Sequence, residues 1–466
     1  MTPLQQHSTE HHSQTPPDKT RTGGADWPLL RRLRCSWCHD AFHYSELHSG
    51  YGILECHCDR WPVVDSIPII QRTPVGHFEH TKNTVRYRST DHLELVELID
   101  ARRFDEALLR CLIAPHTLPG LQRLIGWSLS HSKLVVGLWH RLDKAALETL
   151  LTRRNALTAT DLFEFFCNPS TPLGDGAREY FTYRFGQPRH LAALALIESA
   201  IPPGPQPVLD IACGAGHLDH YLERRSNPTA VIGCDFNFFQ LWIAKHWIAR
   251  QSDFVCTDVR AGLPFADDAF SAAICSDAYH CIKDRRPLLS EIERCAPQKP
   301  LVLARAGNRS IRPNEGFETD IRGYLDEVPG AQVFHDSGLV SDYLERRVPR
   351  PSSPDQAREH KWVSFVRNAA PASALSAQWP HAVGQLVLNP IYRVHHEGDA
   401  LHLRYHSPSD WFEFENGQMS TYLPRRLTVT REELQTPSES LIRQTVVIGV
   451  PDRYNADSVR AAGLGT

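Results

Sequence analysis

Three features that would narrow the function at once are missing from this sequence. It contains no uninterrupted run of about 18 apolar residues, which a membrane-spanning helix would need. The polar start of the chain lacks the apolar segment of a secretory leader. The net charge of −4 also gives no overall positive field that would draw the protein onto nucleic acid. We therefore expect no membrane partner and no nucleic-acid binding driven by overall charge.

The 12 cysteines do not form the dense framework of a small secreted disulfide protein, and this usage predicts a reducing, cytoplasmic location. Eight of them are scattered through apparent core segments. The other four form two close pairs, Cys35 with Cys38 and Cys56 with Cys58. Thiolates spaced like this can reach one ion, so we interpret the four as ligands of a closed, structural Zn²⁺ site. Three nearby histidines are alternative ligands: His39, His43 and His57.

Composition divides the chain into several segments. The start of the chain is rich in His, Thr, Gln, Pro and Gly and has few apolar residues to bury. The sequence after the cysteines instead shows apolar residues at three- and four-residue spacing, which is typical of helices. The Pro-rich stretch IPPGPQP then marks a sharp break. The predicted segments are a disordered tail (1–26), a cysteine-containing domain (27–75), a helical region (76–200), an α/β core (201–330) and a C-terminal α+β extension (331–466).

The α/β core shows short apolar runs that alternate with helical stretches. The runs read PVLDIAC, TAVIGCD, DFVCTD, FSAAICS and PLVLARAG. This alternation predicts βαβ units, and hence a Rossmann-like, doubly wound parallel sheet with helices on both faces. We expect the extension to complete this sheet and the substrate pocket, with a packed hairpin, or a pocket lining, at 410–424. Its predicted strands lie at 362–366, 384–389, 401–406 and 444–450.

The sharpest motif is VLDIACGAG, in which a buried strand leads into a loop of small residues and then into a helix. Gly214 and Gly216 let the backbone approach a ligand where a Cβ would clash. A dinucleotide site needs G-x-G-x-x-G, and this loop lacks that spacing. Asp210 places a carboxylate just before the loop, which suits a cationic amino-acid group better than a pyrophosphate.

This segment resembles the class I S-adenosylmethionine-dependent methyltransferase family, whose first motif reads roughly D/E-x-G-x-G-x-G, with Ala212 here in place of the first glycine. The resemblance implies that Asp210 and the loop face the methionine part of S-adenosylmethionine, that Asp235 accepts the ribose hydroxyls and that Asp258 lies near the adenine. The alternative for the last two is a helix cap or turn. The implied cofactor-binding residues are Asp210, Ala212, Cys213, Gly214, Gly216, Asp235, Phe236, Asp258, Val259 and Ser276.

Two further groups of residues lie where the resemblance places the acceptor. Tyr279 and His280 follow the fourth strand, and His280 is the candidate general base because its reference pKa is near neutrality. The alternative is a histidine of the pocket wall. Before the first strand, the stretch 178–190 either covers the cofactor with Tyr180, Tyr183, Arg184 and Arg189 or forms a linking helix packed on the sheet.

The early cysteines belong to a second resemblance. After the second pair the chain reads WPVVDSIP, and this signature is similar to the small zinc-ribbon domain that accompanies many methyltransferases. A relative that forms a separate subunit activates tRNA, rRNA and protein methyltransferases. The resemblance implies a structural Zn²⁺ without a catalytic role, and the alternative is a ribbon that has lost its metal.

These resemblances predict an S-adenosylmethionine-dependent methyltransferase acting on O, N or C of a small molecule, in specialised metabolism. One alternative acceptor is tRNA, rRNA or a protein, in which case a basic face with exposed aromatic residues is expected. A third hypothesis is a partner protein that binds the cofactor but has lost catalysis. Blocked space beside the sulfonium would favour that reading.

Overall fold

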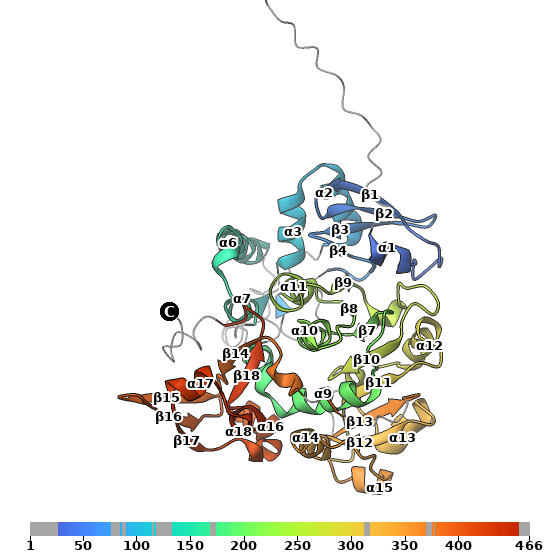
Figure 1. The fold of residues 1–466 in the computed structure, drawn as a ribbon. Coiled ribbons are helices and arrows are strands. Elements are labelled where there is room, and N and C mark those ends of the chain that lie inside the picture. Colours follow the sequence, from blue (N-terminus) through green and yellow to red (C-terminus); the bar gives the residue numbers. More distant parts are fainter. Residues whose placement is uncertain are drawn as a thin grey trace, which may run out of the picture.

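The computed structural model places a seven-stranded sheet at the centre of the molecule (Figure 1). Its order is β12-β13-β11-β10-β7-β8-β9, and β13 alone runs antiparallel to its neighbours. The strands are β7 (Val208–Ile211), β8 (Val231–Asp235), β9 (Asp253–Cys256), β10 (Ala272–Ser276), β11 (Leu301–Gly307), β12 (Gln332–His335) and β13 (Trp362–Arg367).

The structure describes most of the chain from residue 27 onward, and the predicted tail at 1–26 lies outside the described residues. The described residues are 27–75, 84–85, 90–113, 116–117, 133–167, 174–311, 317–369, 375–376 and 378–455.

The order in which the chain visits the strands reverses at β7. The chain moves outward from β7 through β8 to β9 and then returns to β10, on the other side of β7. In a doubly wound sheet such a reversal is the switch point, where ligands bind at the carboxyl ends of the strands. The core strands are buried apolar runs because helices cover both faces. The predicted Rossmann-like sheet is therefore confirmed, and β13 makes it mixed instead of fully parallel.

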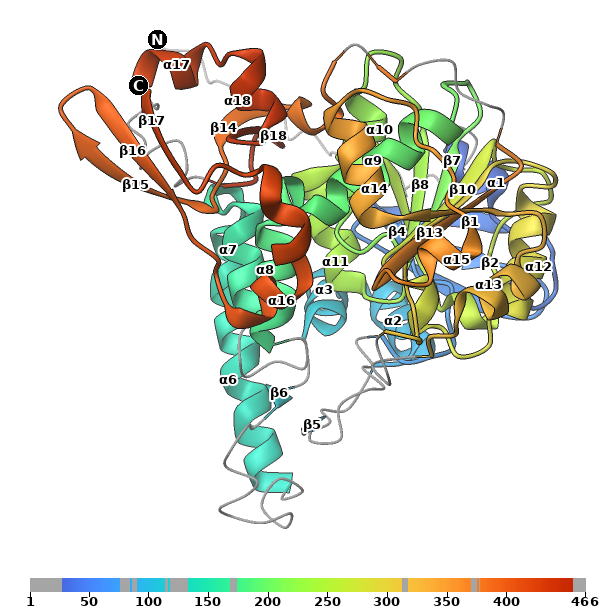
Figure 2. The same ribbon diagram turned by 90° about the horizontal axis from the view of Figure 1, so that it is seen from below.

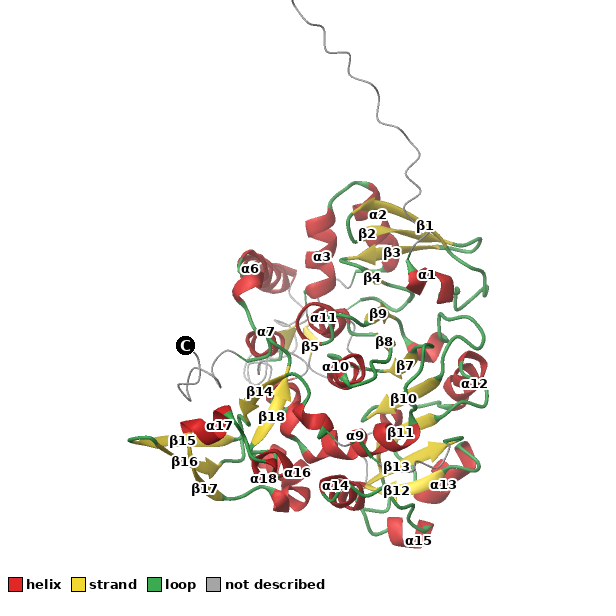
Figure 3. Cartoon of the chain, in the orientation of Figure 1, coloured by secondary structure: helices red, strands yellow, loops and turns green. Residues whose placement is uncertain are grey.

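Helices lie on both sides of this sheet (Figures 1 and 3). One face is covered by α9, α10, α11 and α14, with α9 packed along α14 and against β11, and the other face is covered by α12 and α13. The short helix α15 follows α14 in the chain. Their bounds are α9 (Pro188–Ala200), α10 (His217–Arg224), α11 (Phe238–Ile243), α12 (Arg286–Cys295), α13 (Ile321–Glu327), α14 (Asp336–Leu344) and α15 (Pro354–Ala357).

Residues 27–75 form a small antiparallel domain that docks on β9, the edge strand of the main sheet. Ile69, just after β4, pairs in parallel with Cys256 of β9, which covers backbone groups that an edge strand leaves unpaired. Asp65, between β3 and β4, accepts a hydrogen bond from the indole of Trp242 in α11 (2.8 Å). The elements are α1 (Pro28–Arg32), β1 (His43–His48), β2 (Tyr51–Glu55), β3 (Arg60–Val64) and β4 (Ile67–Pro68).

Between this domain and β7, the described residues are mostly helical. Helices α2 and α3 pack on β3, α7 packs on α8, and Figure 2 shows α6 extending away from the main sheet. Two short paired strands, β5 (Thr84–Val85) and β6 (His116–Thr117), interrupt the helices. None of the helices in the described ranges is long and apolar enough to cross a membrane. The helices are α2 (His92–Asp100), α3 (Phe104–Leu112), α6 (Lys133–Thr152), α7 (Ala159–Phe166) and α8 (Gly174–Thr182).

The C-terminal extension first returns to the main sheet as β12 and β13 and then forms two small sheets, β14-β18 and β15-β16-β17. All four predicted strands are confirmed, as β13, β14, β16 and β18. The predicted hairpin at 410–424 is wrong. Ser409 caps a helix there by accepting a hydrogen bond from the N–H of Phe412, and a 3₁₀ turn follows. The elements are β14 (Gln385–Leu388), β15 (Tyr392–Glu397), β16 (Ala400–Tyr405), α16 (Asp410–Asn416), β17 (Arg426–Thr430), α17 (Arg431–Gln435), α18 (Glu439–Arg443) and β18 (Val447–Val450).

Candidate cofactor site and metal site

The loop at 212–216 connects β7 to α10 in a tight bend. Three of its residues have left-handed backbone conformations, with φ of +55° at Ala212, +57° at Gly214 and +73° at Gly216. Glycine adopts this conformation without strain, whereas the Cβ of Ala212 crowds the backbone. Gly216 is also the N-cap of α10. The bend therefore brings backbone and a helix N-terminus to the switch point, as a ligand loop requires.

Asp235, the last residue of β8, ties this loop to the neighbouring strand. Its two carboxylate oxygens accept hydrogen bonds from the N–H groups of Gly214 (3.1 Å) and Asn237 (2.8 Å). Burial raises the pKa of Asp235 to about 6, and these hydrogen bonds oppose the rise. The next residue, Phe236, leaves 39% of its surface exposed. A held carboxylate beside an exposed ring is an arrangement that can accept a sugar and stack on a base.

Asp258 follows β9 and lies at the same edge of the sheet. Its carboxylate accepts hydrogen bonds from the Arg260 guanidinium (2.8 and 2.7 Å) and from the hydroxyl of Thr73 (2.9 Å). Burial alone would raise the pKa of Asp258, but Arg260 and Thr73 hold it below its usual value. Asp258 also caps the turn Val259–Ala261, so the alternative capping role is present as well. The hydrogen bond from Thr73 joins the N-terminal domain to Asp258. Sequence reasoning missed Thr73, because it lies in none of the motifs.

Asp210 lies in β7, is 2% exposed and has a second buried carboxyl group beside it, that of Asp219. Asp219 is in the first turn of α10 and is 0% exposed. Sequence reasoning missed it because an acidic residue in the first turn of a helix is ordinary. Cys213 lies close to Asp219, because a Cβ on Gly233 would come within 2.8 Å of the Cys213 sulfur and within 2.9 Å of Oδ2 of Asp219.

The candidate residues at and after the end of β10 make contacts with different elements. Tyr279 is buried, and its hydroxyl donates a hydrogen bond to Glu327 in α13 (2.9 Å). The ring of His280 instead lies 5.5 Å from that of Trp362 in β13, between centroids. The hydroxyl of Ser276 is buried without a hydrogen-bond partner among the described residues. Tyr279 is thus engaged away from the loop, which argues against a catalytic role, whereas the role of His280 stays a prediction.

Asp277, also after β10, is the centre of a buried ion network. Its carboxylate accepts hydrogen bonds from Arg184 and Arg189 (3.0 Å each), and Nε of Arg305 lies 3.1 Å from its other oxygen. Glu415 in α16 binds Arg189 (3.2 Å) and Arg305 (2.9 Å) in turn. The two arginines before β7, considered above as a cover for the cofactor, therefore fix α9 and the C-terminal extension to the ends of β10 and β11.

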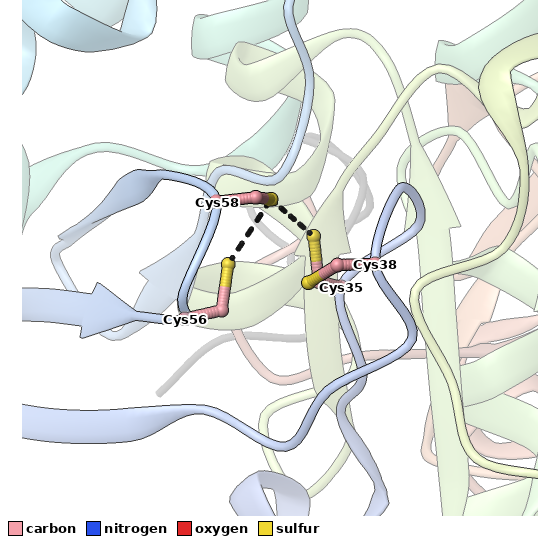
Figure 4. Close-up of side chains that lie close together, drawn as sticks. All are labelled: Cys35, Cys38, Cys56 and Cys58. Carbon is pink, nitrogen blue, oxygen red and sulfur yellow. Dashed lines mark hydrogen bonds between the residues drawn. The ribbon is translucent and has the colours of Figure 1, made fainter.

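The four early cysteines converge on one point (Figure 4). The sulfur atoms of Cys35, Cys38, Cys56 and Cys58 all lie within 4.8 Å of one another, and Cys58 is 3.5 Å from both Cys35 and Cys56. Four thiolates around one Zn²⁺ have sulfur–sulfur separations of about 3.8 Å, so the arrangement fits a tetrahedral ion. Of the alternative ligands, His57 contacts Asp40 and forms a second, overlapping group with Cys38.

Comparisons with known proteins match the middle of the chain. The family model described as a methyltransferase domain matches residues 209–300. Demethylmenaquinone methyltransferase of Renibacterium salmoninarum is 29% identical over 187 residues, covering 39% of this chain and 73% of that protein. Phthiotriol/phenolphthiotriol dimycocerosates methyltransferase of Mycobacterium tuberculosis is 33% identical over 163 residues, covering 31% and 57%. The chain thus spans little more than half of the mycobacterial relative.

Among solved structures, geranyl diphosphate C-methyltransferase from Streptomyces coelicolor is 17% identical and covers 38% of this chain and 76% of that chain, with a TM-score of 0.31. The sheet order, the glycine loop and the family match define residues 209–300 as a class I S-adenosylmethionine-dependent methyltransferase domain. The resemblance seen in the sequence is confirmed for this domain. In this chain the domain lies between a cysteine-containing domain and a long C-terminal extension, neither of which the family model covers.

Proposed function

We propose that this protein transfers a methyl group from S-adenosylmethionine to O, N or C of a small molecule. The observation that carries the proposal is the position of Asp210, Asp235 and Asp258 at the carboxyl edge of three adjacent parallel strands, beside the glycine loop. The family match supports the reaction. The two curated relatives are named for demethylmenaquinone and for phthiotriol dimycocerosates, which supports a small-molecule acceptor.

Within this proposal the crevice holds the cofactor from one end to the other. Asp210 and the loop contact the methionine part, Asp235 accepts the ribose hydroxyls, and Phe236, Asp258 and Val259 surround the adenine. When bound, S-adenosylmethionine supplies a methyl group activated on a positively charged sulfur. Asp235 is already oriented by two backbone N–H groups, so it needs little rearrangement to accept a sugar.

The residues around the acceptor mainly align it, because methyl transfer is an in-line displacement. The acceptor atom forms the new bond to carbon while the sulfur keeps the electron pair of the bond that breaks. An O–H or N–H acceptor must also lose a proton. We assign His280 as the base that receives it, because it follows β10 and so lies at the carboxyl edge of the sheet, where the cofactor site is proposed. Tyr279 does not share this role, since its hydroxyl binds Glu327.

We also propose that Cys35, Cys38, Cys56 and Cys58 hold a structural Zn²⁺, supported by their spacing and by the mutual distances of their sulfur atoms. Four protein ligands leave no open position for a substrate, so this ion stabilises the domain instead of taking part in the reaction. The domain it stabilises pairs with the edge strand β9 and reaches Asp258 through Thr73. The ion thereby supports the adenine side of the crevice.

Calorimetry with S-adenosylmethionine and S-adenosylhomocysteine tests the cofactor site. Replacing Asp235 by alanine removes the acceptor of the Gly214 N–H and the proposed ribose contact, so we expect binding to weaken by at least ~30-fold. Asp253→Ala is the matched control. Asp253 is the first residue of β9, so it lies at the amino ends of the strands, away from the proposed site, where it contacts Lys245. This variant should therefore bind the cofactor normally. Undiminished binding in Asp235→Ala would remove Asp235 from the site.

A panel of acceptors then tests the substrate class. Turnover of small hydroxyl, amine or activated-carbon compounds supports the proposal. Turnover of RNA, with binding that weakens steeply as salt rises, would reassign the acceptor. Cofactor binding without turnover across the whole panel would favour a partner protein that has lost catalysis.

A further inference from the structure

Two buried carboxyl groups lie against each other beneath the glycine loop. Asp210 and Asp219 are 2% and 0% exposed, and they come from β7 and from the first turn of α10. Among the described residues, no N–H or hydroxyl group donates to Oδ1 of Asp210 or to either oxygen of Asp219. The two carboxyl groups are close to each other, because Asp210 pairs with Gly233 across the sheet and a Cβ on Gly233 would lie 2.9 Å from Oδ2 of Asp219. Each carboxyl group is therefore the available hydrogen-bond partner of the other. Such a bond requires a proton on one of them.

The surroundings make a single shared proton the stable state of the pair. Two adjacent buried carboxylates repel each other, so one of them stays protonated at neutral pH. Burial raises the pKa of Asp210 to about 7 and raises that of Asp219 as well. The one cation that faces the pair in the described structure is Arg184, which already binds Asp277. The other titratable groups facing the pair are Glu223, Asp235, Cys213, Cys234 and Cys275.

Asp219 occupies space that two glycines leave open. A Cβ on Gly216 would lie 3.4 Å from Oδ2 of Asp219, and a Cβ on Gly233 would lie 2.9 Å from the same atom. The carboxyl group therefore sits directly behind the loop that, under the proposed function, holds the methionine part of the cofactor. That part of the ligand carries an α-ammonium group, which is the positive charge that the pair lacks.

We propose that Asp219 is a positioning residue for the cofactor, which shares a proton with Asp210 in the empty protein and gives that proton up to solvent when the α-ammonium group of S-adenosylmethionine binds. The inference rests on the proposed function and extends it. One O–H bond of the pair breaks, its proton passes to the buffer, and both carboxylates then balance the ammonium charge. Asp219 acts through Asp210 and need not touch the ligand.

Calorimetry of the full chain in several buffers with different ionisation enthalpies measures this proton directly. At about pH 6.5 the binding heat of S-adenosylmethionine should vary linearly with the buffer enthalpy, with a slope near one proton released per cofactor. S-adenosylhomocysteine keeps the ammonium group and should give the same slope. Methylthioadenosine lacks the amino-acid part and should bind without releasing a proton. Below the pKa of the pair, the affinity for S-adenosylmethionine should fall about tenfold per pH unit.

Two variants separate this role from a purely structural one. In Asp219→Asn the proton release and the pH dependence of cofactor affinity should both disappear, provided that its circular dichroism matches the wild type. Asp267→Asn changes an exposed carboxylate, 82% accessible in its side chain, and should behave as the wild type does.

A wild-type binding heat that does not depend on the buffer would overturn the inference while leaving cofactor binding intact. Equal proton release with methylthioadenosine would overturn it too, and neither result depends on a variant that must fold. Absence of binding heat with all three ligands would instead reject the proposed function.

Discussion

Replacing Asp277 by asparagine removes the negative charge at the centre of the buried ion network. Asp277 lies within 3.1 Å of three guanidinium groups, those of Arg184, Arg189 and Arg305, and all four side chains are at most 7% exposed. Although burial raises the pKa of Asp277, the three arginines hold it well below its usual value. The carboxylate is therefore ionised in the folded protein, and its loss leaves buried positive charge without a partner.

The expected loss in the free energy of unfolding depends on the partners that each arginine retains when the Asp277 carboxylate is removed. Removing one partner of a buried ion pair typically costs about 3–5 kcal/mol. Arg189 and Arg305 retain Glu415, and Arg305 also retains Asp336 (3.1 Å). Arg184 keeps its stacking on the ring of Tyr180. We therefore expect a loss near the lower end of that range, about 3 kcal/mol, in urea unfolding followed by circular dichroism.

The matched control is Asp267→Asn, because Asp267 binds Arg294 through a carboxylate that is 82% exposed. An exposed pair of this kind contributes at most about 1 kcal/mol, so the control should unfold close to the wild type. A loss below about 1 kcal/mol in Asp277→Asn would refute the reasoning, since it would mean that solvent or rearrangement compensates the three arginines.

Three further predictions concern the loop and the N-terminal domain. Ala212→Gly should raise the unfolding free energy by about 0.5–1 kcal/mol, because it relieves the positive φ, and thermal melts measure it. Cys35→Ser should abolish Zn²⁺ in elemental analysis, whereas Cys295→Ser should not, because Cys295 is not one of the four clustered cysteines. A metal-free wild type would reject the site. Thr73→Val should weaken S-adenosylmethionine binding about fivefold in calorimetry while Zn²⁺ content is unchanged; equal affinity would exclude this coupling.

The acid limb of the stability curve gives one more test, at Asp258. Its folded-state pKa lies below the unfolded value, so its stabilisation is complete above about pH 4 and is lost as pH falls through the folded pKa. Asp258→Asn should therefore be less stable than the wild type at neutral pH and should lose less on acidification. Parallel curves of melting temperature against pH for the two proteins would contradict this assignment.

The core of the fold could be predicted because its signals are local. Each parallel strand is a short apolar run followed by a helical stretch, and the glycine bend and Asp235 lie at the ends of two such runs. The convergence of the four cysteines also follows from close spacing in the chain. In all these cases residues near one another in sequence, or in equivalent positions of repeated βα units, determine the geometry.

What sequence reasoning missed depends on contacts between distant segments. Arg305 and Glu415 are 110 residues apart, and nothing in the periodicity of either segment pairs them. Asp219 looks like an ordinary residue of a first helical turn until Asp210 is placed beside it. At 410–424 the aromatic residues favoured a strand, but the hydroxyl of Ser409 supplies a helix cap that outweighs this preference.

Two segments outside residues 209–300 contact the carboxyl ends of the strands, one on each side of β7. Thr73, from the N-terminal domain, binds Asp258 beyond β9, and Glu415, from the C-terminal extension, binds the arginines beside β10 and β11. A parallel sheet fixes the positions of its strand ends, but the side chains beyond those ends need partners of their own. Here those partners come from parts of the chain that the family model does not cover. The loop and the strand ends alone therefore do not supply all the contacts made by these side chains, and the flanking segments are part of the construction of the site.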